Sequence, residues 1–375
     1  MVSLKAVQAS NAALRSTTSG QVSLFVGATS GIAFHTLTEY ARNANRPKVY
    51  IVGRNEATLS KVIADLKKIN PEGTFLPIKS EISLLKNVDA ACDELKSKEK
   101  SLDLLLMCPG YLKLSRQGSL HHHLANSTLS AEIRPTKASY RVSIADSIPH
   151  HTDNADGLED TISLRYYVRA RFIANLLPLL SSPQTSRIVS IHGAGKEGKM
   201  DENDLELARS FSMQSAAVHT STMNTLALAE IASTHPSISC VHVFPGVVVT
   251  KAFTVFAADW VLPLRWFFVH AVLPFAKLFT VSLPESGQRH LFHATSARYP
   301  PAEVKDSPAA GVVLQKGMVV AKGEDGLQGS GCYLLNYDGE TIGDQKLLDE
   351  YRKRGMGKKI WAHTQEVFDR VLSKA

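Results

Sequence analysis

The stretch that decides the fold is a short apolar run, Val22–Val26, followed by residues 27–33, Gly-Ala-Thr-Ser-Gly-Ile-Ala. A helical pattern then extends from residue 32 to about residue 44. A turn that passes close to a pyrophosphate excludes side chains, which explains the glycines, and the following helix offers free N–H groups and a positive dipole end. Because the glycines occur between a strand and a helix, this stretch predicts a nucleotide site.

Strands and helices alternate along the rest of the chain. The predicted strands are residues 22–26, 49–52, 74–78, 102–107, 187–191 and 239–244, and the predicted helices are 32–44, 57–69, 88–96, 165–180 and 213–233. Most of these strands are continuous apolar runs, which is typical of parallel strands covered on both faces. The pattern predicts an α/β protein with a doubly wound parallel sheet.

One domain is expected over residues 20–300, with a C-terminal extension over residues 301–375 that packs on it. The extension contains a predicted strand, Cys332–Leu335, and a charged helix, Gln345–Leu372. Residues 118–151 form an irregular insertion with five histidines. Three interpretations of this insertion are open: a solvated loop, a metal site and translated intron sequence. Consecutive histidines point in different directions, so no metal site is predicted.

Composition excludes several classes of protein. With 375 residues, 44% of them hydrophobic, the chain can bury a large core and is not a disordered protein. The net charge is +7, but the basic residues are spread out, so no nucleic-acid partner is expected. The four cysteines form no close pair, and residues 1–21 hold no apolar core of signal-peptide length. We expect a cytoplasmic protein.

The glycine turn resembles the Thr/Val-Gly-x3-Gly-x-Gly turn of short-chain dehydrogenases, with Ala33 in place of the last glycine. The resemblance implies a Rossmann fold with a nicotinamide cofactor. In that family an acidic residue after the second strand accepts the ribose hydroxyls of NAD. This chain has Arg54 there, which suits the 2′-phosphate of NADP(H).

Other segments carry the same resemblance. Glu81 looks like part of the family's acidic–apolar pair beside the adenine, and Gly110 alone matches the family's Asn-Asn-Ala-Gly turn. Residues 245–250 resemble the Pro-Gly-x3-Thr segment that lines the nicotinamide. The predicted cofactor-binding residues are Gly27, Thr29, Ser30, Gly31, Ile32, Arg54, Asn55, Glu81, Gly110, Pro245, Gly246, Val248 and Thr250.

The family's catalytic residues are missing. A tyrosine and a lysine lie four residues apart on one helix of the family, but none of the ten tyrosines here has lysine four residues later. The matching helix offers Ala216 and Thr220 instead. The family's serine position falls near His192-Gly193, and its helix asparagine falls near Arg165 or Tyr166. The candidate catalytic residues are His219, His192 and Ser215, of which histidine can act as acid or base near neutral pH. The alternative is that they are polar neighbours of an inactive site.

An apolar, aromatic stretch spans residues 257–284. It predicts a lid over a hydrophobic small-molecule substrate or a peripheral contact with a membrane surface, and a spanning helix is a third possibility that its basic residues and prolines disfavour. We therefore predict an NADP(H)-dependent oxidoreductase, similar to divergent fungal members of the family that serve natural-product pathways. A non-redox isomerase, dehydratase or cyclase, or a non-catalytic nucleotide-binding protein, are the alternatives. The sequence does not predict the oligomeric state.

Overall fold

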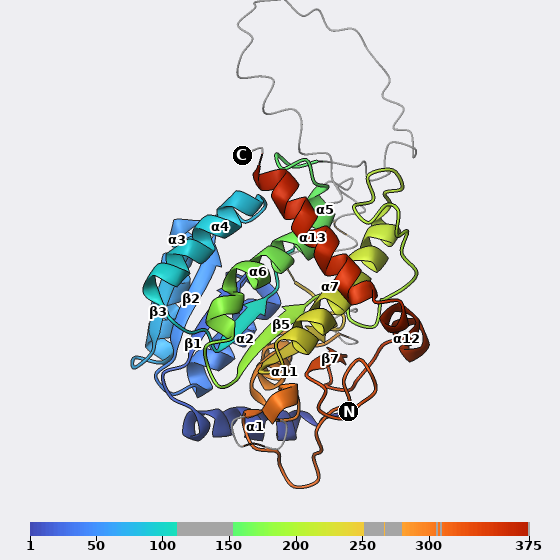
Figure 1. Ribbon diagram of the computed structural model, residues 1–375. Coiled ribbons are helices and arrows are strands. Elements are labelled where there is room, and N and C mark those ends of the chain that lie inside the picture. Colours follow the sequence, from blue (N-terminus) through green and yellow to red (C-terminus); the bar gives the residue numbers. More distant parts are fainter. Residues whose placement is uncertain (111–152, 251–265, 267–279, 305–306, 308–309, 374–375) are drawn as a thin grey trace, which may run out of the picture.

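The computed structural model describes residues 1–110, 153–250, 266, 280–304, 307 and 310–373. Its seven strands form one sheet in the order β3-β2-β1-β4-β5-β6-β7, and every neighbouring pair is parallel (Figure 1). The strands are β1 (Val22–Val26), β2 (Lys48–Gly53), β3 (Thr74–Lys79), β4 (Leu104–Met107), β5 (Ser186–Ile191), β6 (Ile238–Val243) and β7 (Cys332–Leu335). The predicted doubly wound parallel α/β sheet is confirmed.

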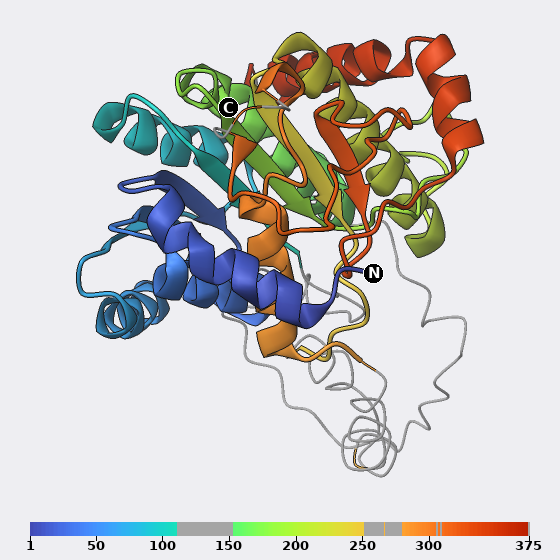
Figure 2. The ribbon, with the colours of Figure 1, turned by 90° about the horizontal axis from the view of Figure 1, so that it is seen from below.

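Helices cover both faces of the sheet. α2, α3 and α11 share one apolar core with the sheet, and α4, α6, α7 and α13 share the other (Figures 1 and 2). The helices are α1 (Leu4–Thr17), α2 (Gly31–Asn43), α3 (Glu56–Ile69), α4 (Leu85–Lys98), α5 (Asp160–Ile162), the π-helix η2 (Ser163–Tyr167), α6 (Val168–Leu180), α7 (Met213–Thr234), α11 (Leu283–Thr295), the short η5 (Ala302–Val304), α12 (Gln345–Lys353) and α13 (Met356–Leu372).

Burial explains the apolar strands. Every residue of β1, β4, β5 and β6 is buried, because these strands have a neighbour on each side and helices above and below. β3 forms one edge of the sheet and alternates between buried and exposed residues. Its Pro77 is tolerated there because an edge strand has one side on which no N–H is needed.

An N-terminal helix is present that the sequence analysis did not predict. α1 packs against α11, and the two helices lie side by side in Figure 2. Its buried stripe contains Val7 and Leu14 but also Ser10 and Asn11, so the apolar periodicity is weak. The Asn11 amide donates to the main-chain carbonyl of Gln288 at 2.8 Å, which joins the two helices.

The C-terminal extension does more than pack on the domain. Its strand β7 pairs with β6 and completes the sheet, and α13 packs on α7 and α4. The prediction of one helix over Gln345–Leu372 is wrong: Gly355, with φ +64°, separates α12 from α13 because that backbone conformation ends a helix. The insertion at residues 118–151, and most of the stretch at residues 257–284, lie outside the described residues.

The strand order places the functional site. The chain runs from β1 outward to β3, then returns to β4 beside β1 and continues outward to β7. Ligands of doubly wound sheets bind in the crevice at the carboxyl ends of the strands where this reversal occurs. Here that crevice lies beyond the ends of β1 and β4, next to the glycine turn.

Candidate active site

The glycine turn joins the carboxyl end of β1 to the start of α2. Gly27 has φ +77°, and a Cβ built there would lie 2.8 Å from the carbonyl oxygen of Cys108. The end of β4 therefore requires glycine at this position, whether or not a ligand is bound. Gly31 also has a positive φ, +66°, but the nearest described atom to a Cβ there is the Thr250 methyl group at 3.8 Å. The backbone of the turn thus leaves room above the start of the helix.

The amino end of α2 suits a phosphate group. Ser30 is the N-cap residue, but its side chain makes no capping hydrogen bond. The N–H group of Ala33 donates to the Cys108 thiol. The Ser30 hydroxyl and the other N–H groups of the first turn can therefore donate hydrogen bonds to phosphate oxygens. The Thr29 methyl packs against Gly53 at the end of β2, so the turn is held beside that strand.

The end of β2 presents an accessible guanidinium. The Arg54 side chain is 79% exposed and lies 3.5 Å from the Glu81 carboxylate, which is 51% exposed. An exposed ion pair of this kind contributes little stability, so Arg54 is free to turn toward a ligand. The neighbouring Asn55 is already engaged, since its side-chain oxygen accepts from the N–H of Thr58 at 2.8 Å and caps α3.

The segment after β6 closes the crevice from the other side. Gly246 has φ +74°, and a Cβ there would lie 2.9 Å from the Tyr337 ring, so glycine is required. Val248 is buried, and Thr250 brings its methyl group to the glycine turn at Gly31. Of the other predicted cofactor residues, Ile32 and Pro245 are half-buried, and Gly110, with φ +159°, is exposed after β4. The structure therefore brings the predicted turn and the predicted nicotinamide segment together.

A buried guanidinium, Arg169 on α6, lies beneath this crevice. One terminal nitrogen donates to the Met107 carbonyl at 3.0 Å and the Ser190 hydroxyl at 2.9 Å, and the other donates to the carbonyls of Pro109 at 2.8 Å and Ile191 at 3.1 Å. Arg169 is 2% exposed, and burial lowers its pKa to about 10, so it stays charged at neutral pH. It joins the ends of β4 and β5 and supplies positive charge under the site.

Arg169 was not among the residues predicted from the sequence. One signal was available, because Arg165 and Arg169 lie one helical turn apart on a mostly apolar helix. No ion pair links the Arg169 guanidinium to a carboxylate among the described residues. Its charge therefore acts on the neighbouring groups of the site.

His192 lies at the end of β5, next to that charge. Its Nε2 is 3.1 Å from the Thr220 hydroxyl, which also lies 2.7 Å from the Ala216 carbonyl. A carbonyl can only accept, so the Thr220 hydroxyl donates to Ala216, and Nε2–H of His192 donates to Thr220. Burial first, and then the charge of Arg169, lowers the pKa of His192 well below its usual value. The imidazole is thus neutral, with its lone pair on Nδ1.

A second buried histidine, His242 near the carboxyl end of β6, lies behind the first, and the two rings stack with centroids 6.1 Å apart. Its Nε2 accepts the N–H of Gly193 at 3.2 Å, so its Nδ1 carries the proton and donates to the Thr225 hydroxyl at 2.9 Å. Thr225 in turn donates to the Glu197 carboxyl at 2.7 Å. This hydrogen-bonded chain ends at the residue beside His192 and fixes the loop after β5.

The imidazole in this hydrogen-bonded chain is neutral. Burial lowers the pKa of His242 to about 3, and burial also raises the pKa of Glu197. The two groups are 3.7 Å apart, but they do not form an ion pair because His242 carries no charge at neutral pH. None of the members of this hydrogen-bonded chain was predicted from the sequence, because they come from a loop, a helix and a strand.

Asn224 connects α7 to the π-helix that precedes α6. Its side-chain amide donates to the main-chain carbonyls of Arg165 at 2.9 Å and Thr220 at 2.7 Å. The π-helix η2 contains Arg165, whose charge also lowers the pKa of His192. Asn224 therefore holds the two helices that carry Thr220 and Arg165 on either side of His192.

The other two predicted catalytic residues, His219 and Ser215, stabilise the local backbone. His219 is 3% exposed and its Nε2 accepts the N–H of Asp201 at 3.1 Å, which fixes the loop before α7. Ser215 forms a reciprocal capping box with Ser212 at the start of α7. The structure joins neither side chain to His192 by a hydrogen bond.

Two further features bear on the class of site. Among residues 1–110, 153–250 and the later described segments, no cluster of three histidine, cysteine or acidic side chains could hold a metal ion. All four cysteines are free thiols; Cys92, Cys240 and Cys332 are buried, and Cys108 is half-buried.

The parallel sheet with a glycine turn at its switch point defines a Rossmann-type nucleotide-binding oxidoreductase. A family model for short chain dehydrogenase matches residues 21–134. The chain is 38% identical over 374 residues to the oxidoreductase AN1596 of Emericella nidulans, with 100% of both chains covered. It is 32% identical over 376 residues to the oxidoreductase andH of Emericella variicolor, covering 100% of this chain and 99% of that one. The chain belongs to the short-chain dehydrogenase/reductase family.

A solved structure with the same fold is L-sorbose reductase from Gluconobacter frateurii, in complex with NADPH and L-sorbose. The TM-score is 0.52 and the sequence identity is 15%, with 80% of this chain and 97% of that chain covered. At this identity the likeness supports the fold alone. The resemblance to fungal short-chain dehydrogenases is confirmed by the relatives, and the chain is an oxidoreductase of that family.

Proposed function

We propose that this oxidoreductase uses NADP(H) to interconvert a carbonyl group and an alcohol on a hydrophobic small molecule. The observation that carries the choice of NADP(H) is Arg54, an accessible guanidinium at the end of β2 where an acidic residue would select NAD. The sorbose reductase in complex with NADPH shows that this fold accommodates such a cofactor. We also propose a role in a natural-product pathway, which is what the resemblance to divergent fungal members of the family implies.

The residues of the crevice fit such a cofactor. Gly31 and the uncapped end of α2 offer a backbone cradle for the pyrophosphate, and Thr250 lies across the turn. When bound, the nicotinamide ring supplies or accepts the hydride. Val247, which is 55% exposed beside this segment, offers apolar surface to the substrate.

His192 is the group best placed to handle the proton. In the direction of alcohol oxidation its neutral Nδ1 orients a water molecule that accepts the hydroxyl proton and passes it to solvent. In the direction of ketone reduction the same water donates a proton to the oxygen and recovers one from solvent. Arg169 and Arg165 favour negative charge on that oxygen, because both are cations close to His192. These groups take the place of the absent tyrosine and lysine.

The first prediction concerns the choice of cofactor. We expect wild type to bind NADPH more tightly than NADH, and Arg54→Ala to lose about 1.5–3 kcal/mol of NADPH affinity, because a charge-assisted contact to the 2′-phosphate is removed. This corresponds to roughly a 10- to 150-fold rise in Kd. NADH affinity should not change. Fluorescence titration of both cofactors measures this.

Lys79→Ala is the matched control for Arg54. Lys79 is another exposed cation, at the end of the neighbouring strand β3, but it is paired with Glu56 at 2.9 Å. It should change neither affinity by more than about twofold, since exposed pairs contribute little. Equal affinity of wild type for NADPH and NADH would refute the choice of NADP(H).

The second prediction concerns His192. We expect His192→Gln to lower turnover about 10²- to 10⁴-fold, because positioned acid–base groups contribute on that scale, with NADPH affinity unchanged. Consumption of NADPH with a panel of lipophilic ketones measures turnover. His219→Gln is the control, and it should keep turnover where the protein stays folded. Full activity in His192→Gln would transfer the role to water or to a residue outside the described segments.

A non-redox reaction is the second candidate function. It is favoured by the neutral imidazole of His192 over a buried cation, an arrangement that suits removal of a proton from carbon with stabilisation of the resulting enolate. Product formation without any change in NADPH absorbance would identify it. Tight NADPH binding with no product from any substrate would instead favour the non-catalytic alternative.

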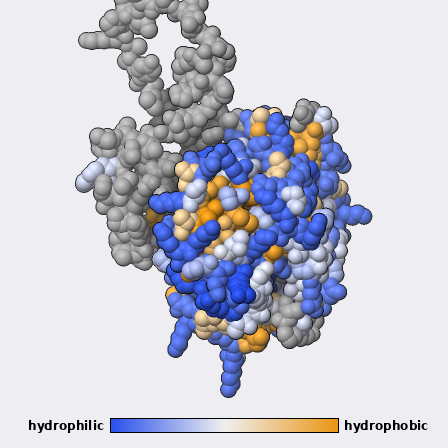
Figure 3. All heavy atoms as spheres, turned by 90° about the vertical axis from the view of Figure 1, so that its left-hand side faces the viewer, coloured by the Kyte–Doolittle hydropathy of each residue, from blue (hydrophilic) through white to orange (hydrophobic). Residues whose placement is uncertain are grey.

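Peripheral contact with a membrane through residues 257–284 is also a proposal. Trp266, one of the few described residues of this stretch, is 64% exposed. In the described part of the chain no helix is long and apolar enough to cross a membrane. On the face shown in Figure 3, hydrophobic residues form small groups among hydrophilic ones. Any such contact would therefore involve this stretch rather than that face.

A further inference from the structure

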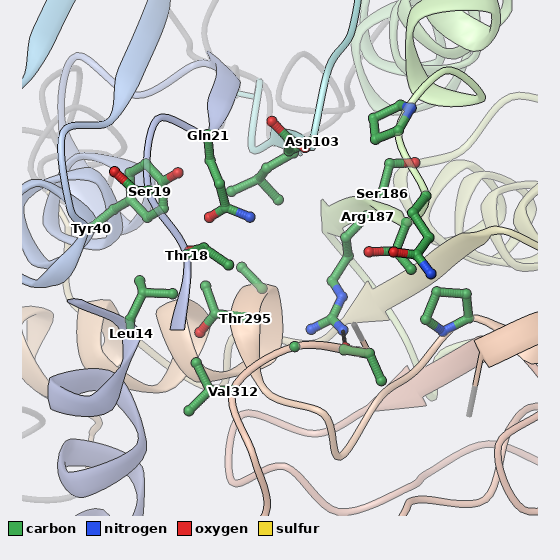
Figure 4. A pocket seen from close by; sticks show the side chains of 18 of the residues that line it. Leu14, Thr18, Ser19, Gln21, Tyr40, Asp103, Ser186, Arg187, Thr295 and Val312 are labelled. Carbon is green, nitrogen blue, oxygen red and sulfur yellow. Dashed lines mark hydrogen bonds between the residues drawn. The ribbon is translucent and has the colours of Figure 1, made fainter. Parts of the chain in front are cut away.

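A cavity of about 390 Å³ lies at the opposite edge of the sheet from the glycine turn. It opens beside the amino ends of β1, β4 and β5, and α1, α2 and α11 contribute to its walls (Figure 4). This volume is within the range of small-molecule binding sites. Residues that line it and bear on its chemistry are Leu14, Tyr40, Asp103, Ser186, Arg187 and Val312.

One buried hydroxyl in this cavity has no partner. Ser186, the first residue of β5, is 4% exposed, and its Oγ makes no hydrogen bond within the protein. Leaving a buried hydroxyl unsatisfied destabilises a folded protein. Because Ser186 lines the cavity, a bound molecule can satisfy its hydroxyl group.

Asp103 offers an acceptor from another wall. Its Oδ2 accepts the N–H of Val22 at 2.8 Å, which leaves Oδ1 without a hydrogen-bond partner among the described residues. Burial raises the pKa of this carboxyl group, and the main-chain bond opposes that effect. A ligand that donates a hydrogen bond would satisfy Oδ1.

The charges around the cavity disfavour an ionic ligand. Arg187 carries a buried positive charge, but its two terminal nitrogens already donate to four carbonyls, those of His293, Ser296, Tyr299 and Ala310. An anion would find no free terminal N–H on this guanidinium and would face the Asp103 carboxylate. A cation would face the charge of Arg187. A neutral donor avoids both conflicts.

We propose that this cavity binds an uncharged small molecule that carries hydroxyl groups on an apolar body. The hydroxyls bond to Asp103 and Ser186, and the apolar body packs on Leu14 and Val312, both of which are buried. The site is separate from the nucleotide crevice, since the sheet lies between them. Ligand and NADPH therefore bind at the same time, and the site does not depend on the proposed function.

The test uses trans-1,2-cyclohexanediol as the probe and measures its binding to the full chain by saturation-transfer NMR and calorimetry. We expect saturable binding to wild type and none to Thr18→Trp, because Thr18 lines the cavity and an indole there fills it. Thr17→Trp is the matched control. It adds the same ring at the exposed neighbouring position and should bind the diol like wild type. NADPH affinity should be equal in all three proteins.

Ser186→Ala gives a second readout. It should weaken diol binding about 2- to 10-fold, the effect of one hydrogen bond, without lowering the Tm of the free protein, because the hydroxyl has no partner there. Cyclohexanecarboxylate and cyclohexylamine should bind more weakly than the diol. The proposal is overturned if wild type shows no saturable diol binding, if Thr18→Trp retains it, or if either charged analogue binds more tightly.

Discussion

Arg169→Met is expected to destabilise the protein by about 3–5 kcal/mol, the cost of removing several hydrogen bonds from buried acceptors, and to abolish tight NADPH binding. The guanidinium donates to four acceptors at the ends of β4 and β5, and methionine removes this donor from the carbonyls of Met107, Pro109 and Ile191. The turn after β4 then loses its attachment beside the crevice. Urea unfolding measures the first effect, and fluorescence titration with NADPH measures the second.

Arg171→Met on the same helix separates the two effects. Arg171 forms a bidentate pair with Asp89 at 2.6 and 2.9 Å, and this pair lies on α4 and α6, remote from the crevice. It should lower stability by a smaller amount and leave NADPH affinity unchanged. Arg169→Lys should resemble Arg169→Met, because one ammonium group cannot reach four acceptors. If Arg169→Met lost less than about 1 kcal/mol and bound NADPH like wild type, the role of Arg169 would be wrong.

Acidification below pH 6.5 is expected to destabilise the protein strongly. Burial lowers the pKa of His242 to about 3 and of His290 to about 4, and it lowers the pKa values of His192 and His293 well below 6.5. Below pH 6.5 the unfolded chain therefore binds protons that the folded chain does not bind. Stability falls with pH in this range, down to the folded pKa of each histidine.

The expected size follows from proton linkage. Between pH 6.5 and 5.5 each such histidine lowers the free energy of unfolding by about 1 kcal/mol, and four of them by about 4 kcal/mol. Urea unfolding at both pH values measures the change. His290→Leu should reduce it by one histidine's share, whereas His235→Leu, at a half-exposed loop position, should not. Equal stability at the two pH values would contradict the buried neutral state.

The fold could be predicted because its signals are local. Most of the strands through β6 are apolar runs, and the predicted bounds of β1 match the structure. α1 was not predicted because two of its four buried residues are polar, and its buried face is defined only by its contact with α11, whose Gln288 lies 277 residues after Asn11. The break at Gly355 was missed because both flanking helices are amphipathic and charged.

In the candidate site, too, the residues with local sequence signals could be predicted and the others could not. The nucleotide residues are contiguous in sequence, and the structure gathers Gly31, Thr250 and Arg54 around one crevice. The groups that control proton chemistry are contributed by different elements, so no motif reveals them. His192 was found from its place after a strand, but its neutrality follows first from burial and then from the charge of Arg169, both of which only the folded chain provides.

Because α1 packs against α11, the order in which the parts of this chain are synthesised differs from the order in which they can fold. Domains fold in the order in which the ribosome makes them only when neighbours in sequence are neighbours in space. After its own synthesis α1 must wait until residues 283–295 have been added before it can cover its apolar stripe, and β6 keeps an open edge until residue 335. A nascent chain of this protein would therefore expose first one of these surfaces and then both, and it is during this interval that we expect chaperones to bind it.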